Sequence, residues 1–247
     1  MRCYRFSGLF ICFNMKTLLF LIFVFVICSS RGAWAQNSAI DISKIPITAD
    51  VPAGFAPAGW KVEGIAKGDL NADGRADLAI KLIEDKGAEE KETPQPDRNR
   101  VMVVAFEVGG KLKRVAVADK LLQCTSCGGA FYGVLEAPAN VSISKGVIVV
   151  EQEHGSREVS KSTFRFRHDA SRGRFVLIGY DYSSYDRAAG GASAESTNYL
   201  TGLRITTIGN GKRNSKKQTS IKPPKIFLDD VDGDAIEYEA VQRLGLG

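Results

Sequence analysis

The sequence is poor in the side chains that most often carry metal, redox or nucleophilic chemistry. It contains two histidines, His154 and His168, in 247 residues. A structural zinc site needs four ligands, and these two histidines do not have the paired spacing that supplies them. The segment His154-Gly155-Ser156-Arg157 lacks the Gly-x-Ser-x-Gly elbow of serine hydrolases and is interpreted as a turn at the end of a strand. The sequence therefore names no nucleophile and no acid–base pair, and the catalytic residues are unknown.

Long hydrophobic runs are also scarce. The main one, Thr17–Ile27, is shorter than the roughly 20 residues that a membrane-spanning helix needs. It follows Lys16 and precedes Ala33-Trp34-Ala35, and this order of charge, apolar core and small-x-small site is typical of a secretory signal peptide. Residues 1–35 are thus predicted to be a signal peptide, and the mature chain to be periplasmic or secreted, with no transmembrane segment after cleavage.

A strong excess of positive charge is absent from the mature chain. The full sequence has a formal net charge of +5, but residues 1–35 contain four basic residues (Arg2, Arg5, Lys16 and Arg31) and no acids, which leaves +1 after cleavage. The basic run within Gly209–Gln218 has no interleaved aromatic residue and is interpreted as a solvated hairpin tip. Nucleic acid is therefore not an expected partner.

Helical periodicity and fixed-period repeats are missing, and alternating or continuous apolar strands dominate. The fold is expected to be mainly β, a single domain of antiparallel hairpins (sandwich-like or open sheets) with few short helices. Residues 36–59 are predicted to form an extended N-terminal lead-in and residues 60–247 the β-rich domain. Ala188–Ser196 is predicted to be a loop, and Ala116–Gln123 and Ala235–Leu244 are the helix candidates. Three hairpins are expected: Val101–Val108 with Leu112–Val117, Val141–Ile143 with Val147–Glu151, and Thr163–His168 with Phe175–Gly179.

The segment 69–77 does indicate a ligand. Oxygen-bearing side chains stand at positions one, three, five and nine of the nonapeptide 69–77, with Gly74 at position six. This spacing suits Ca²⁺, which prefers several carboxylate, amide and backbone oxygens. The loop is not an EF-hand, because position twelve is Ile80 instead of a bidentate glutamate and the flanks are strands. The predicted ligands are Asp69, Asn71, Asp73, the carbonyl of Arg75, and Asp77. A metal-free turn rich in Asx residues is the alternative.

The run from Gly68 to Leu78 resembles the calcium loop of the FG-GAP or VCBS-type repeat, Asp-x-Asn/Asp-x-Asp-Gly-x-x-Asp between two strands. Such repeats commonly build the blades of β-propellers in surface proteins. The resemblance covers one repeat, about Trp60–Ile83, so it does not imply a full propeller. The Ca²⁺ is expected to be structural rather than catalytic, because three clustered carboxylates repel one another unless neutralised and binding would fix the connection between the two strands.

The mature chain retains two cysteines, Cys124 and Cys127, in the segment Cys-Thr-Ser-Cys-Gly-Gly. An oxidising compartment favours a disulfide between them. A thioredoxin-like redox motif would need this spacing at a helix N-terminus, and a metal site would need further ligands. The segment, with the strands that follow it, resembles a group of small exported bacterial proteins that combine it with one such calcium loop.

These features predict an exported, calcium-stabilised β-domain that acts as a non-enzymatic binding or structural module in the cell envelope. The partner is expected to be an envelope protein or a glycan. Polar aromatic residues between Asp181 and Asp186 form either a binding edge for such a partner or half-buried tyrosines at the rim of a sheet. The alternative is a periplasmic enzyme, either a hydrolase with carboxylates near the metal or a Cys-x-x-Cys thiol oxidoreductase.

Overall fold

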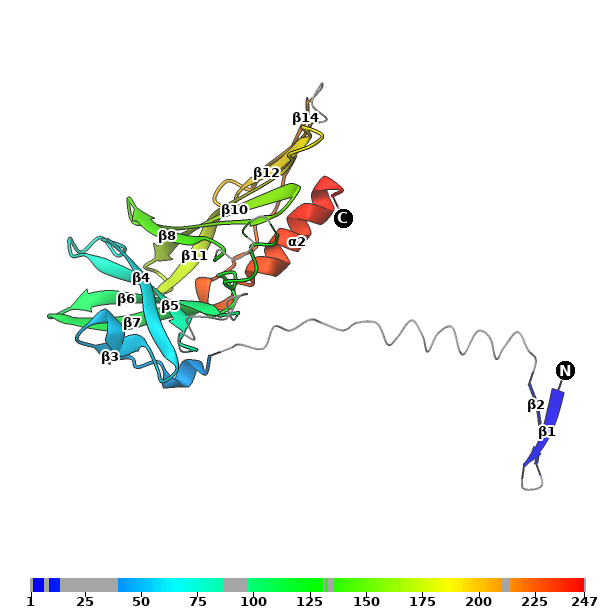
Figure 1. Ribbon diagram of the computed structural model, residues 1–247, viewed down its shortest axis with the longest axis horizontal. Coiled ribbons are helices and arrows are strands. Elements are labelled where there is room, and N and C mark those ends of the chain that lie inside the picture. Colours follow the sequence, from blue (N-terminus) through cyan, green and yellow to red (C-terminus); the bar gives the residue numbers. More distant parts are fainter. Residues whose placement is uncertain are drawn as a thin grey trace. The chain divides into compact units, whose positions relative to one another are not determined.

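The computed structural model describes residues 2–6, 9–13, 40–86, 97–130, 132, 136–209 and 214–246 (Figure 1). The chain forms two compact units, Met1–Asn37 and Ser38–Gly247. In the first unit, β1 (Arg2–Phe6) pairs antiparallel with β2 (Leu9–Phe13). The apolar run and the cleavage site of the predicted signal peptide lie outside the described residues.

The second unit is built on two antiparallel sheets, which confirms the expected fold class. One has five strands in the order β3-β7-β6-β5-β4, and the other has seven in the order β14-β13-β12-β11-β10-β9-β8. The five-stranded sheet comprises β3 (Thr48–Ala49), β4 (Trp60–Gly68), β5 (Asp77–Glu84), β6 (Arg100–Val108) and β7 (Lys111–Ala118). The seven-stranded sheet comprises β8 (Ala139–Ser144), β9 (Val147–Gly155), β10 (Glu158–Asp169), β11 (Arg174–Asp186), β12 (Ala192–Asn198), β13 (Leu203–Gly209) and β14 (Asn214–Ser220). The three predicted hairpins are present as β6–β7, β8–β9 and β10–β11.

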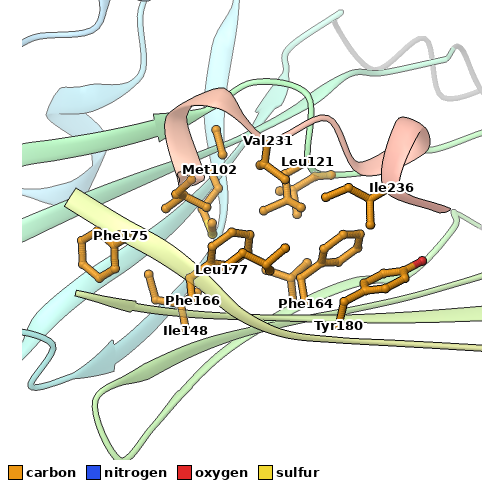
Figure 2. Packing of buried hydrophobic residues seen from close by; sticks show 14 of the residues in the cluster. Met102, Leu121, Ile148, Phe164, Phe166, Phe175, Leu177, Tyr180, Val231 and Ile236 are labelled. Carbon is orange, nitrogen blue, oxygen red and sulfur yellow. The ribbon is translucent and has the colours of Figure 1, made fainter. Parts of the chain in front are cut away.

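Burial explains the two kinds of strand sequence. Most side chains of β5 and β6 are buried, because hydrophobic clusters cover both faces of these strands. β10 alternates instead, with Phe164 and Phe166 buried and Arg167 exposed, because its sheet packs against the core on one face only. Figure 2 shows these phenylalanines beside Phe175 and Leu177 of β11, with Met102 of the other sheet facing them.

The segment expected to be an extended lead-in contributes to the second cluster. It contains the short 3-10 helices η1 (Ile42–Lys44) and η2 (Pro52–Phe55), as well as β3. Ile40, Ile45 and Phe55 are buried against Leu82 and other side chains of the five-stranded sheet. Residues 40–59 therefore cover one face of that sheet.

Of the two helix candidates, the C-terminal one is confirmed. α2 (Gly233–Leu244) begins at Asp232, whose side chain accepts a hydrogen bond from the Ala235 amide, an N-cap interaction. Its buried residues Ile236, Ala240 and Leu244 recur every four positions and pack on the core. Figure 2 shows Ile236 in this packing.

Two other expectations were wrong. Ala116–Ala118 completes β7, where Met102↔Ala118 pairing extends the strand, and residues 119–123 form no helix. The predicted loop Ala188–Ser196 contains most of β12, which pairs with a strand on each side. No helix among the described residues is long and apolar enough to cross a membrane.

Candidate metal centre and disulfide loop

The predicted calcium loop joins β4 to β5, and the pair Gly68↔Asp77 closes its base. The base is tightly packed, because a Cβ atom on Gly68 would lie 2.4 Å from Cγ2 of Ile143 in β8. The glycine at loop position six has φ +82°, in the left-handed region that favours glycine. Ala72 also has a positive φ, +65°. The sequence therefore folds here into a narrow hairpin loop fixed at both ends.

The three exposed or partly exposed ligand side chains of this loop accept hydrogen bonds from its backbone amides. The carboxylate of Asp69 accepts hydrogen bonds from the Ala72 amide (2.7 Å) and the Gly74 amide (2.9 Å), which spans the loop. Asn71 accepts one from the Asp73 amide at 3.0 Å, and Asp73 accepts one from the Arg75 amide at 2.9 Å. These are the short Asx hydrogen bonds of the metal-free alternative, and all of them leave lone pairs on the oxygens unused.

Asp77 differs because it is completely buried. Its carboxylate accepts hydrogen bonds from the Leu70 amide (2.9 Å) and from the Glu107 amide of β6 (3.0 Å). Burial raises the pKa of Asp77, the two amide hydrogen bonds lower it, and the charges of Asp73 and Asp69 raise it further. This carboxylate thus links the loop to β6, the middle strand of the five-stranded sheet.

Arg75 supplies the positive charge on the exposed side of the loop. Its guanidinium lies 2.8 Å from the Asp73 carboxylate and 3.1 Å from that of Glu107. The side-chain and backbone hydrogen bonds from Arg75 lower the pKa of Asp73 to about 2. Arg75 is therefore bound to the Asp73 carboxylate, which is the ligand predicted at loop position five.

The five predicted ligands thus lie in one loop, but their side chains are not gathered around one point. In the described part of the chain, no group of three or more Asp, Glu, His or Cys side chains is placed to hold a metal ion. The donor set of three carboxylates, one amide and a backbone carbonyl suits Ca²⁺. A cation at this site would compete with the Arg75 guanidinium for the Asp73 carboxylate, and Arg75 also contacts Glu107.

The cysteine pair has disulfide geometry, with 5.1 Å between the Cα atoms of Cys124 and Cys127. Thr125 fixes the loop, because its amide and hydroxyl both bond to the backbone of Arg98 and its carbonyl accepts from the Ala137 amide. The pair lies in a turn and not at the start of a helix. A structural disulfide fits these surroundings better than the thioredoxin-like arrangement, which uses a helix N-terminus.

Sequence reasoning missed a charged network that leads to this disulfide loop. The Arg100 guanidinium, with a side chain 2% exposed, bonds both oxygens of Glu63 at 2.9–3.0 Å and the Ala137 carbonyl at 2.9 Å. Lys81 lies 3.4 Å from Glu63 and donates to the Ala139 carbonyl. The available signal was the presence of Lys81 and Arg100 within otherwise apolar strands.

A second missed cluster connects α2 to the seven-stranded sheet. Glu237 lies 2.5 Å from Nε2 of His154 and accepts a hydrogen bond from the Ser162 hydroxyl. The carboxylate thus stands between the imidazole and the hydroxyl, whereas a catalytic triad places the imidazole next to the nucleophile. Ser156, which follows His154 by two residues, belongs to the turn after β9. The cluster therefore attaches the helix and does not form a triad.

Comparisons with protein-family models, with curated proteins and with solved structures gave no match.

Proposed function

We propose that this chain is an exported β-domain, stabilised by Ca²⁺, that acts as a non-enzymatic binding or structural module in the cell envelope. The observation that carries the proposal is the position of the acidic loop. It connects two strands of the five-stranded sheet, and through Asp77 it bonds to a third, β6. A cation held there would stabilise the sheet itself.

Side-chain oxygens of Asp69, Asn71, Asp73 and Asp77 and the carbonyl of Arg75 would hold the ion. The ion would offset the mutual repulsion of three carboxylates, one of them buried. Because the loop of the unfolded chain is not arranged for binding, the binding free energy would add to the free energy of unfolding.

Export is supported by the leader pattern of residues 1–35 and by the Cys124–Cys127 disulfide, since disulfides persist in oxidising compartments. The partner would be an envelope protein or a glycan. A hollow of about 350 Å³ on the seven-stranded sheet supports a binding role. Its lining includes Lys161, Thr163, Asp181 and Ser196, which can hydrogen-bond to hydroxyl or peptide groups.

Thermal unfolding of chelator-treated protein tests the calcium part. At a concentration about 100 times Kd, Ca²⁺ should stabilise the fold by about 2.7 kcal/mol. At about 2–4 °C per kcal/mol for a domain of this size, the midpoint should rise by about 5–10 °C. Mg²⁺ should give a smaller rise because it requires a tighter octahedral shell.

Asp73→Ala should abolish the rise, because it removes a ligand from an exposed position. Asp50→Ala is the matched control, since Asp50 is an exposed aspartate outside the loop, and this variant should respond like the wild type. An unchanged midpoint of the wild type at about 10 mM Ca²⁺, well above the millimolar Kd of weak extracellular sites, would contradict the proposal.

A further inference from the structure

A hollow of about 670 Å³ lies where β11 emerges from the β10–β11 turn. Its walls come from the end of β10, from the first half of β11, from the β12–β13 turn and from the segment 223–225. The volume falls within the range of small-molecule sites, about 300–1,000 Å³. The hollow is separate from the calcium loop and from the disulfide loop, none of whose residues line it.

The sheet leaves room for this hollow because β12 pairs only with the second half of β11, from Gly179 onward. Beside the first half, the chain returns after β14 and takes the place of a strand. The Leu177 amide donates to the Ile226 carbonyl at 2.9 Å, and Val176 bridges to Phe227. Pro223 and Pro224 precede this contact and restrict the backbone at the wall of the hollow.

The lining combines apolar surface with positive charge. Val176, Ile178 and Leu200 present apolar side chains, and Leu200 is 55% exposed. Arg167 and Lys225 are exposed and line the same hollow. Neither cation has a hydrogen-bond or ion-pair partner within the described ranges.

Neighbouring arginines differ from these two cations. Arg165 is paired with Asp181 at 2.6 Å, Arg172 with Asp169 at 2.6 Å, and Arg174 with Asp230 at 2.8 Å. The one carboxylate in the lining, that of Asp169, is thus already neutralised by Arg172. The hollow therefore carries an uncompensated positive charge next to an exposed apolar surface.

We propose that this hollow binds an amphipathic organic anion, with its carboxylate held by Arg167 and Lys225 and its apolar part against Val176, Ile178 and Leu200. Charge-assisted hydrogen bonds from a guanidinium to a carboxylate are stronger than neutral ones. Burial of the apolar part supplies the remaining affinity. This site is separate from the proposed partner-binding hollow on the same sheet and does not depend on Ca²⁺.

Decanoate is the probe, and isothermal titration calorimetry of the purified protein in chelator is the measurement. We expect saturable binding of one decanoate per chain, and no comparable binding of decyltrimethylammonium, which has the same chain length and the opposite charge. Arg167→Gln with Lys225→Gln removes both cations that would hold the carboxylate. This double substitution should weaken decanoate binding by at least about tenfold, which corresponds to a loss of about 1.4 kcal/mol in binding free energy. Leu200→Ser should weaken it as well.

Lys216→Gln with Lys217→Gln is the matched control, since it removes the same charge from exposed positions of β14 that do not line the hollow. This variant should bind decanoate like the wild type. Unchanged unfolding midpoints would show that the variants are folded, as expected for exposed side chains without partners. Asp73→Ala should bind decanoate normally, which separates this site from the calcium proposal.

Three results would overturn the inference: no decanoate binding at millimolar concentration, equal binding of the cationic amphiphile, or equal binding by the Arg167→Gln, Lys225→Gln variant. Binding to vesicles of anionic phospholipid without binding of decanoate would also overturn it, since a membrane surface would then be the partner.

Discussion

Single residues determine how the acidic loop can behave. The two amide hydrogen bonds to the buried Asp77 link the loop to β6, whereas the exposed Asp73 is bound by Arg75. The spacing of the nonapeptide identified the candidate ligands, because that pattern is local in sequence. It did not show that Arg75 competes for Asp73 or that Glu107 faces the same arginine, because these contacts depend on side-chain direction and on a strand about 30 residues away.

The ion pair between the buried Arg100 and Glu63 should be sensitive to substitution. Glu63→Gln removes the carboxylate and leaves the cations of Arg100 and Lys81 close together. The free energy of unfolding should fall by less than the about 3–5 kcal/mol that an uncompensated buried charge costs, because the Glu136 carboxylate remains 3.6 Å from the Arg100 guanidinium. Chemical denaturation measures it.

Asp85→Asn is the control for that change. Asp85 pairs with Lys61 at 2.9 Å, but both side chains are about half exposed, and exposed pairs contribute about 0–1 kcal/mol. Equal losses in the two variants would show that the Arg100 pair has no special structural role.

At the scale of elements, sequence patterns succeeded where one face of a strand is buried. The alternation of Phe164 and Phe166 with arginines predicted β10, because the pattern and the burial have the same period. The pattern failed for β12, whose sequence Ala-Ser-Ala-Glu-Ser-Thr-Asn favours turns. That strand forms because β11 and β13 pair with both of its edges, and such pairing is not visible in a local sequence.

α2 shows a second limit of prediction from sequence. Two of its side chains, Glu237 and Arg243, form polar contacts with residues far away in the sequence. Glu237 contacts His154 and Ser162, and the guanidinium of Arg243 bonds both oxygens of the buried Glu195 at 2.7 Å. The sequence offered Ala235–Leu244 as a helix candidate. The sequence did not predict which charged side chains would connect the helix to the seven-stranded sheet.

The contact between His154 and Glu237 predicts a pH dependence of stability. The hydrogen bond to the Glu237 carboxylate raises the pKa of His154, against the opposing effect of burial, and the Glu237 and Asp234 charges raise it further. A histidine with a raised pKa in the folded state contributes stability that is fully present below its unfolded pKa, about 6.5. This contribution is lost as the pH rises through the higher folded value.

The free energy of unfolding of the wild type should therefore decrease from pH 6 to above pH 7, by no more than about 1 kcal/mol, because the His154 side chain is 38% exposed. Denaturant unfolding at several pH values measures this change. His154→Gln should flatten the profile over this range. A profile that keeps the wild-type slope in His154→Gln would assign the titration to another group.

At the level of the whole second unit, the two sheets differ in burial and in the features that they contain. The five-stranded sheet is covered on both faces and contains the base of the acidic loop and the Arg100 network. The seven-stranded sheet is covered on one face by the core and α2 and carries both hollows described above. Features that would stabilise the fold are thus concentrated in one sheet, and features that would bind a ligand in the other.

If one Ca²⁺ stabilises this domain, calorimetric titration of Ca²⁺ into chelator-treated protein should detect its binding. We expect one site per chain with a Kd of about 10⁻⁴–10⁻³ M, as in extracellular calcium modules, and loss of this binding in Asp69→Ala. Absence of saturable heat at Ca²⁺ concentrations up to about ten times that range, or unchanged binding in Asp69→Ala, would contradict it.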